Sequence, residues 1–211
     1  MINQNKTFCY RIVNINNLSL LLQNGMVNKR HHQANNNYIN IGNPEIIDIR
    51  GTTPVRIANY GMIGDYVPFY FTPKSLMLYN IITGYRHPLV PKRHPSEILV
   101  VRCLISELTT LPKWFFTDGQ GNNSLTKHFN NLDQLDEIDW KCIQESNFKN
   151  DADDPDRLRK YQAEFLVHGQ IPLANIESLN VYNQQSAEIV TGILKQNNIN
   201  LAVNIQPLYF F

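Results

Sequence analysis

One apolar run that contains a single carboxylate constrains the fold of this chain most. Residues 160–167 read Lys-Tyr-Gln-Ala-Glu-Phe-Leu-Val, and the Phe-Leu-Val end predicts a strand that packs in a sheet. Glu164 is the only acid in this run, and a buried carboxylate is costly unless another group pairs with it. Two interpretations follow: Glu164 faces solvent on an edge strand, or it is a general acid–base or ligand-anchoring residue.

Length and composition predict a single domain. The 211 residues are 43% hydrophobic and 18% charged, which suits one compact domain spanning 1–211. No stretch approaches the roughly 18 apolar residues that a membrane helix needs. The N-terminal residues are polar, so a cytoplasmic protein without membrane contact is expected. Cys9, Cys103 and Cys142 form neither a metal-binding spacing nor a disulfide framework, which predicts buried free thiols.

Charge is distributed unevenly along the chain, although the net charge is only +1. Residues 1–102 contain 11 Lys and Arg against 4 Asp and Glu, whereas residues 103–211 contain 8 against 14. Such asymmetry can create a cationic face that attracts nucleic acid, or the two halves can intermix in space and cancel. The sequence leaves both arrangements open.

Hydrophobic patterning predicts an α+β domain with several strands and short helices. Helices are expected at 18–24, 75–82, 132–146 and 186–197, with a short helix or turn at 46–50. Residues 29–43 are too polar to build a core and predict a long loop that is functional or disordered. Strands are expected at 8–13, 65–71, 97–105, 114–117, 160–167, 176–182 and 201–205, and Pro68 predicts an edge or bulge position for the second.

Motifs for common cofactors and metals are missing from the sequence. Neither a Walker loop nor a Gly-x-Gly-x-x-Gly run occurs, and there is no His-Glu-x-x-His or Cys-x-x-Cys, so no bound metal is expected. The acidic turn at 151–156 lacks the glycine and distal glutamate of a calcium loop and predicts a solvated surface turn. Arg50, isolated among isoleucines, is either a surface arginine or a guanidinium placed to hold a phosphate or base.

Several segments, taken together and in order, resemble one family. They are Tyr10-Arg11-Ile12-Val13 with Asn17, residues 39–45, Arg50, residues 65–73, Met77-Leu78-Tyr79, Phe116-Thr117-Asp118 and Tyr161-Gln162-Ala163-Glu164. The segments at 65–73 and 161–164 are specific, and the match runs over nearly the whole chain. The chain is similar to DarT, the DNA ADP-ribosyltransferase toxins of the DarT–DarG toxin–antitoxin systems.

The resemblance implies an ADP-ribosyltransferase fold, similar to that of poly(ADP-ribose) polymerases, with a split mixed β-sheet core and short flanking helices. It implies transfer of ADP-ribose from NAD⁺ to a base of single-stranded DNA. The favoured base is thymine, and guanine in DNA, RNA or protein are the alternative acceptors. A catalytically silent single-strand binding module is a further alternative. The implied partners are single-stranded DNA and a cognate antitoxin whose macrodomain removes ADP-ribosyl groups, and a monomer is expected.

Site residues follow from the resemblance by position. Glu164 would be the catalytic glutamate, and Arg50 a second catalytic residue beside the target base. The implied NAD⁺ contacts are Arg11, Asn17, Gly25, Tyr70, Leu78 and Tyr79. The implied DNA contacts are Lys29, Arg30, Asn43, Arg56, Lys74, Met77 and Ser124.

Overall fold

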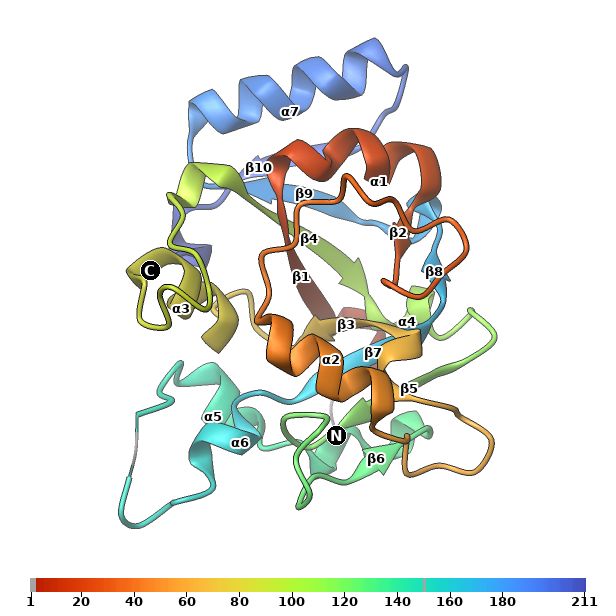
Figure 1. Cartoon of the computed structure of the whole chain (residues 1–211), viewed down its shortest axis with the longest axis vertical. Coiled ribbons are helices and arrows are strands. Elements are labelled where there is room, and N and C mark those ends of the chain that lie inside the picture. The colour runs from red at the N-terminus through yellow and green to blue at the C-terminus, as the bar shows by residue number, and fades with distance from the viewer. Residues whose placement is uncertain (1–2, 150) are drawn as a thin grey trace.

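The computed structural model describes residues 3–149 and 151–211, so that Met1 and Ile2 of the polar N-terminal segment lie outside it. An eight-stranded sheet forms the centre of the molecule in the order β10-β9-β4-β1-β3-β7-β5-β6 (Figure 1). Its strands are β1 (Phe8–Asn14), β3 (Tyr66–Tyr70), β4 (Ile98–Leu104), β5 (Trp114–Thr117), β6 (His128–Phe129), β7 (Glu164–His168), β9 (Ser178–Val181) and β10 (Ala202–Ile205). A separate antiparallel pair joins β2 (Met26–Val27) to β8 (Gln170–Ile171).

The large sheet is mixed and split, as the resemblance implied. Strands β9 and β10 are parallel, and the other neighbours in the sheet are antiparallel. β1 pairs with β4 along its whole length, but it meets β3 only at Tyr10 and Tyr70. The two halves of the sheet therefore diverge between β1 and β3.

The prediction that Pro68 lies at an edge or bulge is wrong in its topology, because β3 lies between β1 and β7. Pro68 is opposite Leu166 of β7, and its carbonyl oxygen accepts a hydrogen bond from Nη1 of Arg11 in β1. That side of Pro68 therefore faces the split, where no ladder partner requires the N–H that proline lacks.

Short helices surround the sheet. α1 and α7 lie together at the end formed by β9 and β10, α2 lies over β3 and β7, and α3 lies beside the C-terminus (Figure 1). Polar caps define several of them: the side chains of Asn43, Ser75 and Asn183 accept backbone N–H groups at the starts of α2, α3 and α7. The helices are α1 (Leu18–Asn24), α2 (Pro44–Thr52), α3 (Leu76–Thr83), α4 (Ile105–Leu108), α5 (Trp140–Gln144), α6 (Arg157–Lys160) and α7 (Gln184–Gln196), with 3₁₀-helices at Gln4–Lys6, Ile15–Asn17, Ile63–Asp65, Pro95–Glu97, Leu132–Glu137, Leu173–Asn175 and Pro207–Tyr209.

Two predicted elements have wrong boundaries, in each case because of contacts between residues that are close in sequence. The strand expected at 160–167 begins only at Glu164, because residues 157–160 form α6. Lys160 of that helix pairs with Asp154 at 3.1 Å, so the acidic turn stabilises a helical turn there. The helix expected at 132–146 is instead a 3₁₀-helix followed by α5, since Asn131 and Asp139 cap the two segments separately.

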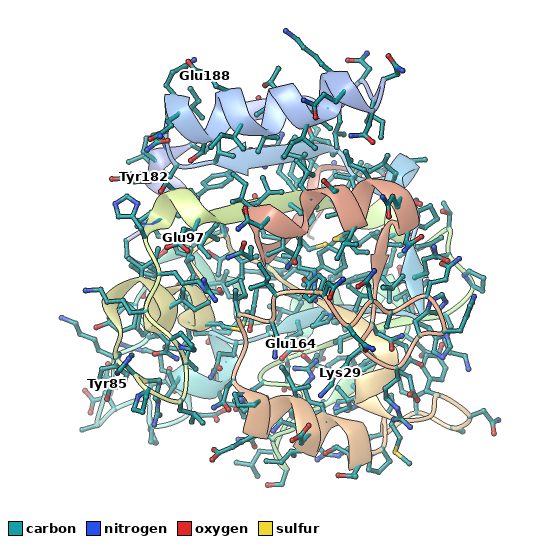
Figure 2. All side chains as sticks on the ribbon, turned by 45° about the horizontal axis from the view of Figure 1, so that its top comes forward. Lys29, Tyr85, Glu97, Glu164, Tyr182 and Glu188 are labelled. Atoms are coloured by element: carbon teal, nitrogen blue, oxygen red, sulfur yellow. The ribbon has the colours of Figure 1, made fainter. Side chains whose placement is uncertain are left out.

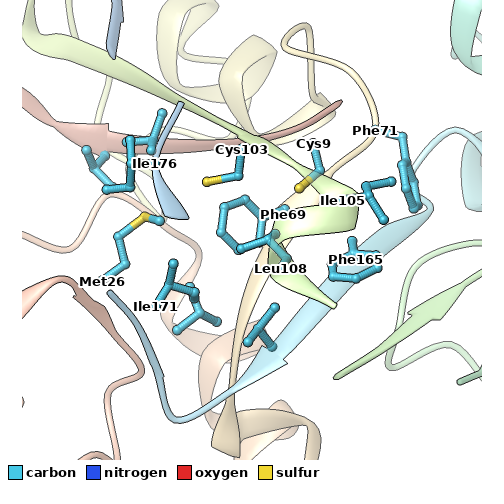
Figure 3. Packing of buried hydrophobic residues seen from close by; sticks show 14 of the residues in the cluster. Cys9, Met26, Phe69, Phe71, Cys103, Ile105, Leu108, Phe165, Ile171 and Ile176 are labelled. Carbon is cyan, nitrogen blue, oxygen red and sulfur yellow. The ribbon is translucent and has the colours of Figure 1, made fainter. Parts of the chain in front are cut away.

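Strand alternation divides the buried side chains between the two faces of the sheet. Phe69 and Phe165 belong to the main core, which Figure 3 shows around Cys9 and Cys103. Leu166 instead joins a smaller cluster with Tyr66, Phe115, Val55 and Ile63. Glu164 has the same parity as Leu166, so it lies on the face away from the main core.

The cysteines are buried free thiols, as predicted. Cys9 and Cys103 are far apart in sequence but face each other across β1 and β4. Burial raises the pKa of both thiols. Among the described residues no group of His, Cys, Asp and Glu could hold a metal, and no described helix is long and apolar enough to cross a membrane.

We expect the main core to supply much of the stability. Leu179 of β9 is completely buried, whereas Leu208 is 80% exposed. Leu179→Ala should lower the free energy of unfolding by about 3 kcal/mol, because it leaves a cavity. Leu208→Ala makes the same chemical change at the surface and should stay within about 0.5 kcal/mol of the parent. Urea unfolding followed by circular dichroism measures both, and equal losses would contradict the assignment of Leu179 to the core.

Candidate active site

Glu164 is buried at the start of β7. Its side chain is 2% exposed, which excludes the solvent-facing interpretation. The residue lies opposite Tyr70 of β3, next to the point where the sheet splits. Figure 2 places Glu164 near the middle of the molecule, beside α2. Burial of this kind requires partners for both carboxylate oxygens.

Arg50 supplies the main partner from the last turn of α2. Its Nη1 and Nη2 donate to Oε1 and Oε2 of Glu164 at 3.0 and 2.7 Å, so the pair is bidentate. Arg50 is itself only 12% exposed. Burial by itself would lower the pKa of the Arg50 guanidinium, but the charge and hydrogen bonds of Glu164 outweigh burial and raise it. Arg50 is therefore a buried, permanently charged group and not a surface arginine.

A close backbone contact holds α2 in the position that this pair needs. A Cβ atom on Gly64 would lie 2.8 Å from the Cα of Gly51, immediately after Arg50. Glycine at position 64 thus lets the end of α2 pack directly on the 3₁₀-helix before β3. Together with the Asn43 cap, this contact determines where the guanidinium projects.

The loop after β5 provides a third donor. The N–H of Gly121 lies 3.3 Å from Oε1 of Glu164, so the carboxylate receives a backbone hydrogen bond as well as the two from Arg50. Gly121 is not among the site residues that the sequence predicts. The available signal was the run Asp118-Gly119-Gln120-Gly121, in which a strand end is followed by two glycines.

Tyr70 and Arg11 complete the polar cluster at the split. Burial, and then the negative charge of Glu164, raise the pKa of the Tyr70 phenol, so Tyr70 stays neutral. The Arg11 guanidinium crosses the split and donates to Pro68 O at 3.0 Å. Alternation along β3 thus sends Tyr66 and Tyr70 to the site face and Phe69 to the core.

Three of the predicted NAD⁺ residues share one cavity. Arg11, Asn17 and Gly25 line it, and Gln33, Asn35 and Tyr38 of segment 29–43 line it as well. Asn17 also anchors that segment, because its amide exchanges two hydrogen bonds with the backbone of Ile39. Gly25 has φ +66°, and a Cβ there would lie 2.2 Å from Ile171 O, so no other residue fits without displacing β8.

Leu78 and Tyr79 are not part of the lining of that cavity. Leu78 is completely buried in the cluster between α3 and the sheet. Tyr79 packs edge-on against Phe148 and Phe211 beside the C-terminus. The structure therefore separates these two residues of α3 from Arg11, Asn17 and Gly25.

The predicted DNA residues have varied surroundings. Lys29 and Arg30 pair with Asp48 and Asp65, and the Lys29 side chain is 73% exposed. Asn43 caps α2, and the ammonium of Lys74 lies 5.7 Å from the centre of the Phe211 ring. Ser124 is exposed, whereas Met77 is half-buried. Arg56 donates from its guanidinium to backbone carbonyls of the loop that contains Ser124.

The geometry of the cluster suits charge stabilisation. A buried carboxylate on a rigid strand stabilises positive charge that develops on a substrate, and an adjacent guanidinium stabilises negative charge. His168 is the last residue of β7 and lies on the same face as Glu164. It is exposed, and its ring contacts the Tyr66 ring. The catalytic centre that the cluster suggests therefore contains Glu164 and Arg50, with Tyr70 and Gly121 around them.

Comparison with known proteins identifies a family and a fold that this chain shares. Residues 10–211 match the family model described as ssDNA thymidine ADP-ribosyltransferase, DarT. A DNA ADP-ribosyl transferase of Escherichia coli O127:H6 is 35% identical over 214 residues, which cover 100% of this chain and 96% of the relative. The structure of Thermus sp. 2.9 DarT in complex with ADP-ribosylated ssDNA has a TM-score of 0.86 at 33% identity and covers 97% of this chain and 96% of that one. The Thermus sp. 2.9 DarT structure with NAD⁺ has a TM-score of 0.82 at 31% identity, with 97% and 98% covered.

We expect Arg50 and Glu164 to be coupled in stability. Arg50→Met leaves a buried carboxylate unpaired and should lower the free energy of unfolding by about 3 kcal/mol. Arg50→Met combined with Glu164→Gln removes the unpaired charge and should recover most of that loss. Denaturant unfolding of the two single variants and the double variant measures the coupling.

Arg102 and Glu177 offer a matched control for this cycle. They also form a bidentate pair, at 2.6 and 2.7 Å, but Glu177 is 38% exposed. Solvent screens that pair, so Arg102→Met and Glu177→Gln should show a coupling below about 1 kcal/mol. A double variant at 50 and 164 as unstable as Arg50→Met alone would disprove the coupling.

Proposed function

Because the chain belongs to the DarT family of single-stranded DNA thymidine ADP-ribosyltransferases, we propose that Glu164 and Arg50 form the centre at which ADP-ribose passes from NAD⁺ to thymine. The protein is an NAD⁺-dependent DNA ADP-ribosyltransferase and the toxin of a toxin–antitoxin system. The observation that carries the catalytic proposal is the buried bidentate contact between two residues 114 positions apart.

The proposed NAD⁺ site is the cavity beside the split. NAD⁺ supplies the ADP-ribosyl group, with nicotinamide as the leaving group. Arg11 brings positive charge to this cavity, and Asn17 binds the backbone of segment 29–43, which also lines it. Gly25 avoids the clash that a Cβ atom would make with the carbonyl oxygen of Ile171. Tyr70, between Arg11 and Glu164 in the charge cluster, would contact the ribose or the nicotinamide ring. Leu78 and Tyr79 then act through the packing of α3.

Glu164 is proposed to stabilise the positive charge that develops on the ribose as the bond to nicotinamide breaks. Preorganised groups of this kind lower a barrier by roughly 3 kcal/mol each. The N–H of Gly121 fixes the orientation of the carboxylate, and the start of β7 fixes its position. Glu164 can also accept a hydrogen bond from a ribose hydroxyl and orient it.

Arg50 is proposed to act on the acceptor base. The ring nitrogen of thymine is a poor nucleophile until it loses its proton, which the overall reaction releases to solvent, and a guanidinium stabilises the resulting anion. The pKa of Arg50 is raised, so this residue acts as a charge and not as the proton acceptor. The same guanidinium holds Glu164, which places the acceptor beside the reacting carbon.

The acceptor must be unpaired DNA. Glu164 is buried, so a base reaches it only after leaving its stack, and this is easiest in a single strand. We propose that Lys29, Arg30 and Lys74 attract the phosphates. Asn43, Met77 and Ser124 are proposed contacts to the same strand.

The remaining assignments are also proposals. Arg11, Arg50 and Glu164 come from both halves of the chain and meet at one centre, which supports a single catalytic domain over 1–211. A monomer in the cytoplasm is proposed, because its DNA and NAD⁺ substrates are found there. As in DarT–DarG systems, we propose a cognate antitoxin whose macrodomain removes the ADP-ribosyl group.

Glu164→Gln should abolish the modification of DNA and keep the fold. The loss of the carboxylate removes the group that stabilises positive charge, and we expect the rate to fall by at least about 100-fold. Incubation with NAD⁺ and a thymine-containing oligonucleotide, followed by mass spectrometry, measures the product. Glu177→Gln removes a carboxylate from the other bidentate pair and should leave the rate unchanged. Full activity in Glu164→Gln would remove Glu164 from the mechanism.

DNA binding should weaken steeply with salt. Each phosphate contact of a single strand contributes a slope of about 0.7 in log Kd against log salt, so Lys29, Arg30 and Lys74 predict a slope near 2. Lys74→Gln should reduce the slope by about 0.7, whereas Lys195→Gln in α7 should not change it. Titration of a fluorescent oligonucleotide at several salt concentrations measures the slopes, and a flat response would count against the cationic contacts.

A further inference from the structure

The loop at 118–127 carries two features that the proposed reaction needs. Gly121, in its buried inner part, donates its N–H to Glu164. Ser124 and Leu125 form its exposed tip, and the Leu125 side chain is 73% exposed although it is apolar. The loop contains no helix or strand. Backbone hydrogen bonds close its base, from the N–H of Asp118 to the carbonyl oxygen of Lys127, and one of its turns, from the N–H of Asn123 to the carbonyl oxygen of Gln120. Side chains from outside the loop add further contacts to it.

Arg56 binds the outer half of this loop from the segment between α2 and β3. Its guanidinium donates to the carbonyl oxygens of Asn123 at 3.0 Å, Ser124 at 2.9 Å and Thr126. Three backbone acceptors on one planar guanidinium require the fork of an arginine, which the single ammonium of lysine does not reproduce. Arg56 therefore holds the backbone directly beneath the exposed tip.

His128 binds the inner half of the loop. Its Nδ1 accepts the backbone N–H of Arg56 at 3.0 Å, and its Nε2 lies 3.0 Å from the carbonyl oxygen of Gly121. Only the neutral imidazole with hydrogen on Nε2 satisfies both contacts. The ring also stacks on Phe115 at a centroid distance of 5.2 Å. One residue thus joins Arg56 to the glycine that orients the catalytic carboxylate.

We propose that Arg56 and His128 are positioning residues that hold the 118–127 loop as a preformed acceptor platform. They fix the Gly121 N–H on Glu164 and present Ser124 and Leu125 to the DNA strand. This inference rests on the proposed function of the site. It also replaces the expectation that Arg56 contacts DNA, because its guanidinium is directed at the loop.

Arg159 holds the same loop from the opposite side. Its Nη1 donates to Asp118 and to Oγ1 of Thr126, and its backbone carbonyl accepts the N–H of Gln120. These contacts remain when Arg56 or His128 is replaced. We call the contacts of Arg56 and His128 with the loop the clamp. Loss of the clamp should therefore loosen the tip and the Gly121 peptide without unfolding the loop.

The charges around His128 give the clamp a pH dependence. Burial lowers the pKa of His128 below its ordinary value of 6.5, and the positive Arg56 lowers it further. The carbonyl of Gly121 and the acids Glu164 and Asp118 act in the opposite direction and are outweighed. His128 is therefore neutral at pH 7. The clamp is lost only as the pH falls through the lowered pKa of His128, below 6.5. Protonation removes the acceptor that binds the Arg56 N–H.

The test compares Arg56→Gln and Arg56→Lys with the parent. Both variants should lower kcat/KM for a thymine oligonucleotide by about 100-fold, since displacement of about 1 Å has that effect, while the KM for NAD⁺ changes little. The salt slope of DNA binding should stay unchanged. Lys127→Gln, at the exposed end of the same loop, is the control and should retain the parental rate. Rescue by Arg56→Lys, together with a slope reduced by about 0.7 in Arg56→Gln only, would mean a phosphate contact and overturn the proposal.

A second pair of measurements does not depend on catalysis. Hydrogen exchange at the amides of residues 121–126 should accelerate in Arg56→Gln and in His128→Phe, which keeps the aromatic stack but removes both hydrogen bonds. His128→Phe should also flatten the acid limb of the kcat/KM profile of the parent below about pH 6.5. Unchanged exchange would overturn the clamp even if DNA is modified. If the parent modifies no oligonucleotide, the proposed function fails, and exchange still decides the clamp.

Discussion

A carboxylate that is 2% exposed at the start of a strand is costly unless a cation meets it, and the guanidinium of Arg50 does so through two hydrogen bonds. Other features of the fold serve this contact. The close approach of Gly64 to Gly51 sets the end of α2, and Gly121 satisfies the same carboxylate from a third direction. The charge that the proposed mechanism uses is thus also the charge that the fold must keep paired.

The split between β1 and β3 shapes the surroundings of this pair. In a continuous sheet, β1 would cover the edge of β3, and Arg11 would have no gap to cross. Pro68 lacks an N–H and faces the gap, while Arg11 uses the free carbonyl there. Arg11 also lines the cavity that Asn17 and Gly25 share, whereas the 118–127 loop contacts Glu164 through Gly121. The proposed donor and acceptor sites are therefore built from different elements.

Local patterns predicted most elements correctly, because helices and strands depend on residues a few positions apart. The helices expected at 18–24 and 186–197, and the apolar run of β4, are examples. The prediction failed where the surroundings of a segment, and not its own pattern, decided the outcome. Lys160 became helical through its contact with the acidic turn, and Pro68 entered an internal strand because its unpaired side meets a gap.

The sequence by itself determined the family, because its segments at 65–73 and 161–164 are specific and the matching segments run in order over nearly the whole chain. The α+β class also followed from it. Only the tertiary structure decided which groups meet: that Arg50 reaches Glu164 across 114 positions, that Leu78 is core, and that Arg56 holds a loop. The physical reason is the separation in sequence between the groups that interact. Periodicity and capping report on neighbours along the chain, whereas the partner of a guanidinium depends on how distant elements pack.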